Sequence, residues 1–146
     1  MVGLCICAAL GFGRVVEAQQ QASKLPRIGY LGASGDLRNP GRNFEAFRRG
    51  MKNLGYSEGE SVLIEFRSAE GNLERAASLV SELLKLNVDV IVVGYLAGTR
   101  AAKQATRTVP IVMVSQEDPV EIGLTQSFAH PQDNLTGVPT SGRDLS

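Results

Sequence analysis

Apolar residues recur with two different periods along residues 27–138. Short apolar runs, several of them rich in β-branched residues, predict strands, and apolar residues spaced three or four apart predict helices. The predicted strands are residues 28–31, 62–67, 88–93, 111–114 and 135–138, and the predicted helices are residues 44–54, 73–84, 97–106 and 120–128. Strands alternating with helices at these intervals favour βαβ units with right-handed crossovers. We therefore predict an α/β fold, a doubly wound parallel sheet of four to five strands with helices on both faces.

The loops beyond the carboxyl ends of these strands are where such sheets bind ligands. The candidate ligand-binding residues in those loops are Ala33, Ser34, Tyr95, Leu96, Ala97, Glu117 and Asp118. The Ser34 hydroxyl can bond a ligand or close its own turn. Tyr95 can cover a ligand or pack as a surface aromatic. Backbone N–H groups at the helix start near Ala97 can bind a ligand carboxylate without any special side chain.

Asp118 is the strongest single acidic candidate in these loops. Its carboxylate can face a ligand amine or hydroxyl, or it can cap a helix that begins at Pro119. Both roles are compatible with each other. The neighbouring Glu117 points in a different direction because it is adjacent in sequence. We therefore do not expect the two carboxylates to form an acid/base pair.

The sequence contains no recognisable set of catalytic residues. The chain has one His, and its two cysteines, Cys5 and Cys7, both lie in the first apolar stretch. The loop at residues 32–36 lacks the glycine spacing of a dinucleotide site and the Lys of a phosphate loop, and Asp36 stands where a nucleophile elbow needs glycine. We therefore predict no catalytic residue, no metal and no cofactor. Fifteen Lys+Arg balance fifteen Asp+Glu, so nothing indicates a nucleic-acid partner.

The first 26 residues differ from the rest of the chain. Residues 1–12 are almost wholly apolar, and Val16 and Ala18 fit signal-peptidase cleavage after Ala18. We predict a signal peptide at 1–18 with an incomplete n-region, because no Lys or Arg precedes the apolar stretch, and a flexible N-terminus at 19–26. The localisation expected from this is periplasmic, in a bacterium. A buried N-terminal helix is the alternative.

A family resemblance rests on these segments: RIGYL at 27–31, NFEAFRRG at 43–50, LGY at 54–56, IEFRSAEG at 64–71, VDVIV at 88–92, AAKQAT at 101–106, VPIV at 109–112, DPV at 118–120 and NLTG at 134–137. In this order and spacing they resemble the ABC-transporter substrate-binding proteins of the tryptophan/tyrosine-binding-like group. The resemblance covers the chain from about Arg27 to its end.

The resemblance implies a type I periplasmic-binding-protein fold. In that family two Rossmann-like lobes close on a small ligand, such as an amino acid, and the closed form docks on an ABC permease in the membrane. It implies that residues 27–138 form the first lobe and that residues 139–146 begin a truncated crossover to a second lobe that is missing. It also implies a solute-binding protein rather than an enzyme.

Two departures from the family pattern bear on the ligand. The family shows Gly-Thr-Pro-Ala after the third strand, and Tyr95, Leu96 and Ala97 stand at the first three of those positions. Leu96 removes a hydroxyl that is expected to face the ligand. Glu117 replaces a small residue and adds a charge beside Asp118.

Two other functions stay open at this point: a nonfunctional fragment of such a protein, and a single-domain flavodoxin-like enzyme. Genomic sequence on both sides of the chain would test the first, and cofactor absorbance or esterase activity would favour the second. A single lobe loses half of the ligand contacts, so we expect weak or absent binding by this chain alone. Its uncovered lobe face is expected to favour self-association.

Overall fold

The computed structural model describes residues 24–115, 120–124 and 133–139. The order of elements is β1 (Arg27–Gly32), α1 (Arg42–Asn53), β2 (Leu63–Ser68), the 3₁₀ helix η1 (Leu73–Arg75), α2 (Ala76–Lys85), β3 (Val90–Val93), α3 (Leu96–Ala105), β4 (Ile111–Ser115) and β5 (Leu135–Pro139). The five predicted strands and three of the predicted helices are therefore present, with bounds shifted by a few residues.

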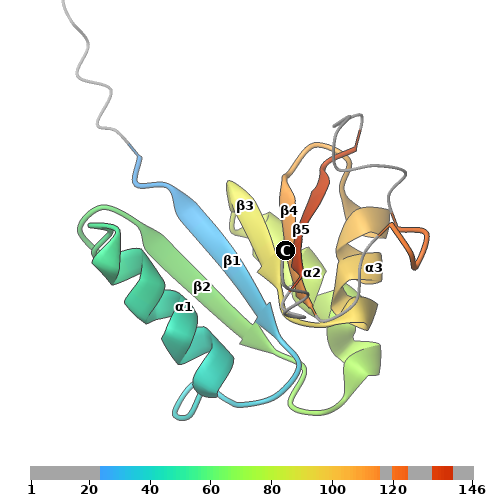
Figure 1. Cartoon of the computed structure of the whole chain (residues 1–146), viewed down its shortest axis with the longest axis horizontal. Coiled ribbons are helices and arrows are strands. Elements are labelled where there is room, and N and C mark those ends of the chain that lie inside the picture. The colour runs from blue at the N-terminus through green and yellow to red at the C-terminus, as the bar shows by residue number, and fades with distance from the viewer. Residues whose placement is uncertain (1–23, 116–119, 125–132, 140–146) are drawn as a thin grey trace, which may run out of the picture.

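One five-stranded parallel sheet organises the described chain, with the strand order β2-β1-β3-β4-β5 (Figure 1). The chain leaves β1 toward one edge to form β2 and then returns to the other side of β1 to form β3. The predicted α/β class and the doubly wound parallel sheet are confirmed. The strand order reverses between β1 and β3, so the crevice at their carboxyl ends is the expected ligand position.

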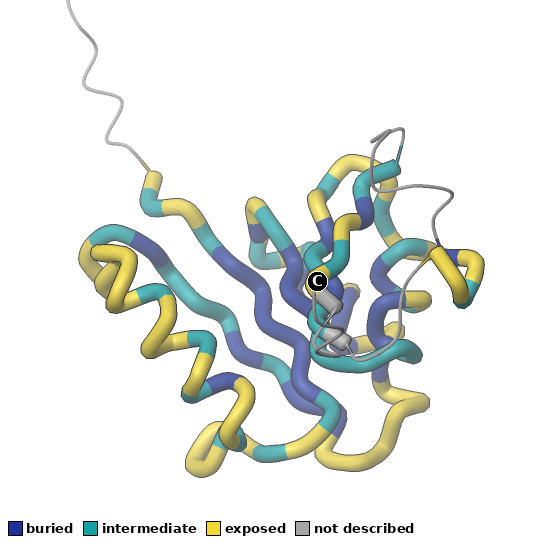
Figure 2. Tube along the Cα trace, in the orientation of Figure 1, coloured by how far each residue is buried: buried dark blue, intermediate teal, exposed yellow. Residues whose placement is uncertain are grey.

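The two faces of the sheet bury different side chains because residues alternate along each strand. Ile28 and Tyr30 of β1 pack with Phe44 beneath α1, whereas Leu31 packs with Leu83 beneath α2 and α3. Helices thus cover both faces, as predicted (Figure 1). Figure 2 shows the central strands mostly buried and the outer side of α1 mostly exposed.

Two boundaries differ from the sequence prediction for local reasons. The strand expected from Val88 begins at Val90, because Asp89 closes the entry to the sheet: its carboxylate accepts the Arg27 backbone N–H at 2.7 Å. The helix expected at 120–128 is wrong for residues 120–124, which form a turn. Gly123 there has φ +70 and donates its N–H to the Val120 carbonyl. Residues 125–128 lie outside the described residues.

The side chains of two asparagines bind nearby backbone groups, one as a hydrogen-bond donor and the other as an acceptor. This difference supplies a stability test. The Asn134 amide nitrogen donates to the carbonyls of Thr106 and Val109, at 3.1 and 2.7 Å, and so ties the start of β5 to the loop before β4. The Asn72 amide oxygen instead accepts the Glu74 N–H at 3.2 Å. At neutral pH an aspartate can accept hydrogen bonds but cannot donate them.

Asn134→Asp is therefore expected to lower the free energy of unfolding by about 1–3 kcal/mol, because it leaves two carbonyls facing a carboxylate. The matched control Asn72→Asp keeps its acceptor and is expected to change stability by less than about 0.5 kcal/mol. Urea denaturation followed by circular dichroism measures both. Equal losses in the two variants would refute the donor role of Asn134.

No helix within the described residues is long and apolar enough to cross a membrane.

Candidate functional site

A small pocket lies at the carboxyl ends of β1 and β3, where the strand order reverses. The two strands meet there through the Gly94 N–H, which donates to the Leu31 carbonyl at 3.1 Å. The pocket has a volume of about 210 Å³, and the residues that line it are Tyr30, Gly32, Ala33, Ser34, Pro40, Gly41, Arg42, Asn43, Phe44 and Gly94. It therefore sits at the position that a doubly wound sheet favours for a ligand.

The loop after β1 forms one wall of this pocket and is held by its own backbone. The Asp36 carboxylate accepts the N–H groups of Arg38 and Asn39 at 2.7 and 2.8 Å, and the Asp36 N–H donates to the Asn39 carbonyl. Gly35 takes φ +89, and a Cβ there would lie 2.7 Å from the Pro40 carbonyl carbon. The turn therefore needs glycine at this position, and it fixes Ser34 opposite the start of α1.

The first turn of α1 faces the pocket without an internal cap. Gly41 precedes the helix with φ 86 and supplies no side-chain cap, and the first helical bond runs from the Glu45 N–H to the Gly41 carbonyl. No described residue accepts the backbone N–H of Arg42, Asn43 or Phe44. These N–H groups remain open to a ligand.

Tyr30 forms the floor of the pocket. Its side chain is only 4% exposed, and its ring lies 4.9 Å from the Phe44 ring and 5.2 Å from the Phe47 ring. A Cβ on Gly94 would lie 3.8 Å from the Tyr30 hydroxyl. Burial raises the pKa of Tyr30, so the hydroxyl stays protonated at neutral pH and can donate a hydrogen bond.

The side chains around the pocket can form hydrogen bonds and one ion pair. Within the described lining, Arg42 is the single charged residue, and none of the others is a carboxylate, histidine or thiol. The described parts of the chain also contain no group of three or more His, Cys, Asp or Glu that could hold a metal. The arrangement offers hydrogen bonds and one positive charge to a small molecule.

The structure brings together two of the residues predicted for the site, Ala33 and Ser34, which line the pocket. Tyr95, Leu96 and Ala97 begin α3 nearby but do not line it. Glu117 and Asp118 lie outside the described residues. The ligand-binding role of all seven residues remains a prediction.

Tyr95 turns back onto its own helix. A Cβ on Gly98 would lie 2.7 Å from the Tyr95 Cζ, so the ring occupies the space that this glycine leaves. Tyr95 and Leu96 both pack against the core under α2 and α3. The Tyr95 hydroxyl is buried without a partner among the described residues, and burial raises its pKa. Its packing therefore favours the structural role over the ligand-covering one.

Sequence reasoning missed most of the lining, including three residues with polar side chains: Tyr30, Arg42 and Asn43. Tyr30 has the spacing of a core residue, and the predicted helix began two residues later than α1 does. A usable signal was Gly41, which stands directly before the helix, where Ser, Thr, Asp or Asn would otherwise satisfy the first N–H groups.

Comparison with known proteins gives consistent matches. The family model described as ABC transporter substrate binding protein matches residues 40–144. A curated relative, the tyrosine-binding protein of Clostridioides difficile (strain R20291), is 30% identical over 94 residues, which are 64% of this chain and 27% of that protein.

Three solved structures share the fold. A ligand-free, open substrate-binding protein with adhesive properties from Clostridium difficile has a TM-score of 0.68 at 23% identity, over 79% of this chain and 39% of that one. A conserved domain protein from Vibrio cholerae has a TM-score of 0.66 at 26% identity, over 80% and 39%. An ABC domain from Streptococcus pneumoniae in complex with L-Trp has a TM-score of 0.64 at 22% identity, over 80% and 39%. The chain thus spans less than half the length of each of these relatives.

Proposed function

We propose that this chain, which belongs to the ABC transporter substrate-binding protein family, supplies one wall of a cleft that captures an amino acid or a related small solute for an ABC permease. The observation that carries the proposal is the pocket between the ends of β1 and β3. It lies at the ligand position of the fold and offers polar groups without reactive ones. The relatives are binding proteins and not enzymes, which agrees with that chemistry.

Capture in this proposal needs no covalent step. The loop after β1 and the first turn of α1 hold their donors in place before the ligand arrives, so little conformational entropy is lost on binding. A second lobe, corresponding to the additional length of the relatives, would close over the ligand by a hinge motion. Residues 27–138 then act as one lobe, and residues 139–146 begin the crossover.

The setting proposed for this activity is the periplasm, with residues 1–18 as the export signal. Two relatives indicate the ligand class: the Clostridioides difficile relative is a tyrosine-binding protein, and the Streptococcus pneumoniae structure holds L-Trp. An aromatic amino acid is therefore the first solute to test.

A titration of the ¹⁵N-labelled chain with L-tryptophan tests the proposal. We expect amide shifts in Ala33, Ser34 and Gly94, with a dissociation constant in the millimolar range, because one wall supplies only part of the contacts. Ser34→Phe fills the pocket and is expected to abolish these shifts. Ser81→Phe places the same ring on an exposed position of α2 and is the matched control.

Two results would count against this proposal. If millimolar L-tryptophan causes no shifts at the pocket residues, the proposed amino-acid ligand is refuted. A micromolar dissociation constant would contradict the idea that this chain supplies only one wall.

A further inference from the structure

The α1 end of the pocket has an excess of hydrogen-bond donors. The backbone N–H groups of Arg42, Asn43 and Phe44 find no acceptor among the described residues, and Gly41 provides no capping side chain. The helix that follows has 12 residues, so its aligned peptide dipoles place partial positive charge at these groups. Such a helix start favours an anion.

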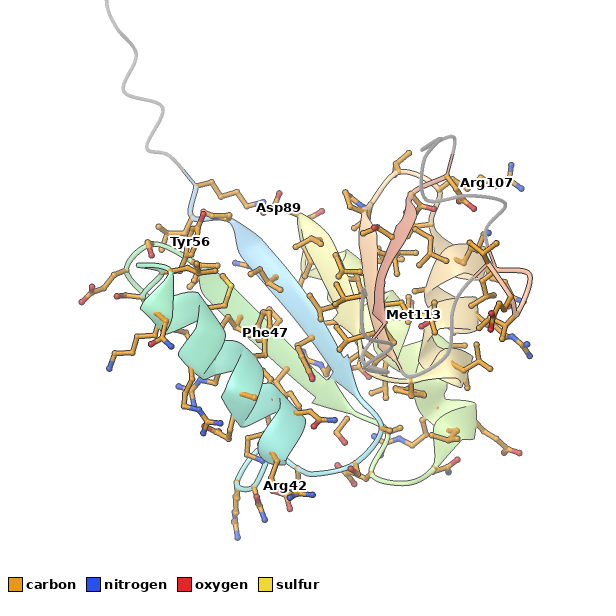
Figure 3. The ribbon with its side chains drawn as sticks, in the orientation of Figure 1. Arg42, Phe47, Tyr56, Asp89, Arg107 and Met113 are labelled. Carbon is orange, nitrogen blue, oxygen red and sulfur yellow. The ribbon has the colours of Figure 1, made fainter. Side chains whose placement is uncertain are left out.

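Arg42 adds a full positive charge at the same end. Within the described chain it forms no ion pair, unlike Arg48 on the same helix, which pairs with Glu45 and Glu58. Figure 3 shows Arg42 at the start of α1, at the edge of the sheet opposite Asp89. The pocket lining contains no carboxylate to compensate this charge.

Tyr30 places an independent hydrogen-bonding group at the pocket. The side chain is almost completely buried, yet its hydroxyl reaches the pocket and forms no hydrogen bond with any described residue. The hydroxyl oxygen is open to the pocket, because the fully buried polar atoms without a partner among the described residues are the Arg27 Nε and the Tyr95 hydroxyl. A ligand atom seated between Gly94 and the start of α1 could therefore accept a hydrogen bond from it.

The start of α3, another helix start at this edge, is less suited to an anion. Tyr95 folds onto Gly98, Leu96 packs against the core, and neither lines the pocket. The pocket volume of about 210 Å³ is below the roughly 300–1,000 Å³ of complete small-molecule sites. It therefore fits one end of a ligand better than a whole aromatic amino acid.

We propose that the ligand's carboxylate binds at the start of α1, with the backbone N–H groups of Arg42–Phe44 and the Arg42 guanidinium as donors and the Tyr30 hydroxyl completing the site from below. This inference rests on the proposed function and deepens it, because it assigns the acidic end of the ligand to α1. The rest of the ligand then extends out of the pocket toward the open side of the cleft.

The test compares L-tryptophan with L-tryptophanamide, which keeps the indole and the amino group but lacks the negative charge. Titration of the ¹⁵N-labelled chain is expected to show L-tryptophan binding about five- to tenfold more tightly, with the largest shifts in the Arg42, Asn43 and Phe44 amides. Arg42→Gln is expected to remove most of this preference. Arg49→Gln removes the same charge two turns further along α1 and is expected to leave the preference intact.

Tyr30→Phe gives a second measurement that keeps the aromatic packing. It is expected to weaken L-tryptophan binding about two- to fivefold, in line with the loss of one hydrogen bond. Unchanged binding in both Tyr30→Phe and Arg42→Gln would overturn the inference.

Sodium acetate separates this inference from the proposed function. One outcome is that acetate shifts the Arg42–Phe44 amides, that these shifts disappear in Arg42→Gln, and that L-tryptophan does not bind. This outcome would support the anion site and refute the amino-acid ligand. Equal binding of L-tryptophan and its amide at Ser34 and Gly94 would support the proposed function and overturn the inference. If neither acetate nor L-tryptophan shifts the Arg42–Phe44 amides, the inference is also overturned.

Discussion

Replacing Leu83 by alanine is expected to lower the free energy of unfolding by about 2–5 kcal/mol, because the change opens a cavity in a closely packed core. Leu83 is fully buried beneath the sheet, in the cluster that joins α2 to β1 and β3. Its two terminal methyl carbons would lie 3.2 Å from a Cβ on Gly29, so the helix approaches the strand as closely as a glycine permits. Urea denaturation followed by circular dichroism measures the loss.

Leu37→Ala is the matched control for this prediction. Leu37 is 82% exposed, so removing the same atoms is expected to change the free energy of unfolding by less than about 0.5 kcal/mol. Similar losses at both positions would contradict the core assigned to the α2 face of the sheet.

A double-mutant cycle with Gly29 sharpens the test. Gly29→Ala alone is expected to destabilise the chain, since the new methyl meets Leu83 at 3.2 Å and Val88 at 3.3 Å. Once Leu83 is shortened to alanine, that methyl has room and refills part of the cavity. The double variant is therefore expected to lose less than the sum of the single variants. Strict additivity would show that the two residues do not share this contact.

The fold was predictable because burial of the central strands on two faces leaves a strong pattern. Val90–Val93 is an uninterrupted β-branched run, which is typical of a strand covered on both sides, and the structure places it between β1 and β4. The bounds were less predictable, since single residues decide them. Asp89 delays the start of β3 by binding the Arg27 N–H, and no periodicity in the sequence reports such a bond.

The position of the candidate pocket followed from the fold, but the side chains that line it did not. Strand-end loops were expected to carry ligand groups, and Ala33 and Ser34 line the pocket. Tyr30 has the spacing of a core residue, and only the structure shows that its hydroxyl reaches the pocket without a partner among the described residues. Arg42 was missed because its importance depends on where the helix begins. The orientation of Tyr95 depends on the space left by Gly98, which spacing alone does not reveal.

Gly35→Ala tests whether the loop wall of the pocket is rigid. Two penalties combine at this position, because a residue with a Cβ is strained at φ +89 and that Cβ would lie 2.7 Å from Pro40 and 2.8 Å from the Asn39 carbonyl oxygen. The contacts are with backbone atoms, which cannot rotate away as a flexible side chain can. We expect the free energy of unfolding to fall by about 2–4 kcal/mol.

Gly59→Ala separates the two penalties. Gly59 has nearly the same conformation, φ +84, but a Cβ there meets nothing within 4 Å, so only the strain remains, at about 1 kcal/mol. The difference between the variants measures how firmly the turn at Asp36 holds residues 35–40 in place. Gly35→Ala is also expected to weaken L-tryptophan binding, because relieving the clash moves Ser34 away from the start of α1, whereas Gly59→Ala is expected to leave binding unchanged. Equal destabilisation by the two variants would mean that the loop yields to the added methyl, and the pocket would then lack the preformed wall that the proposed ligand capture requires.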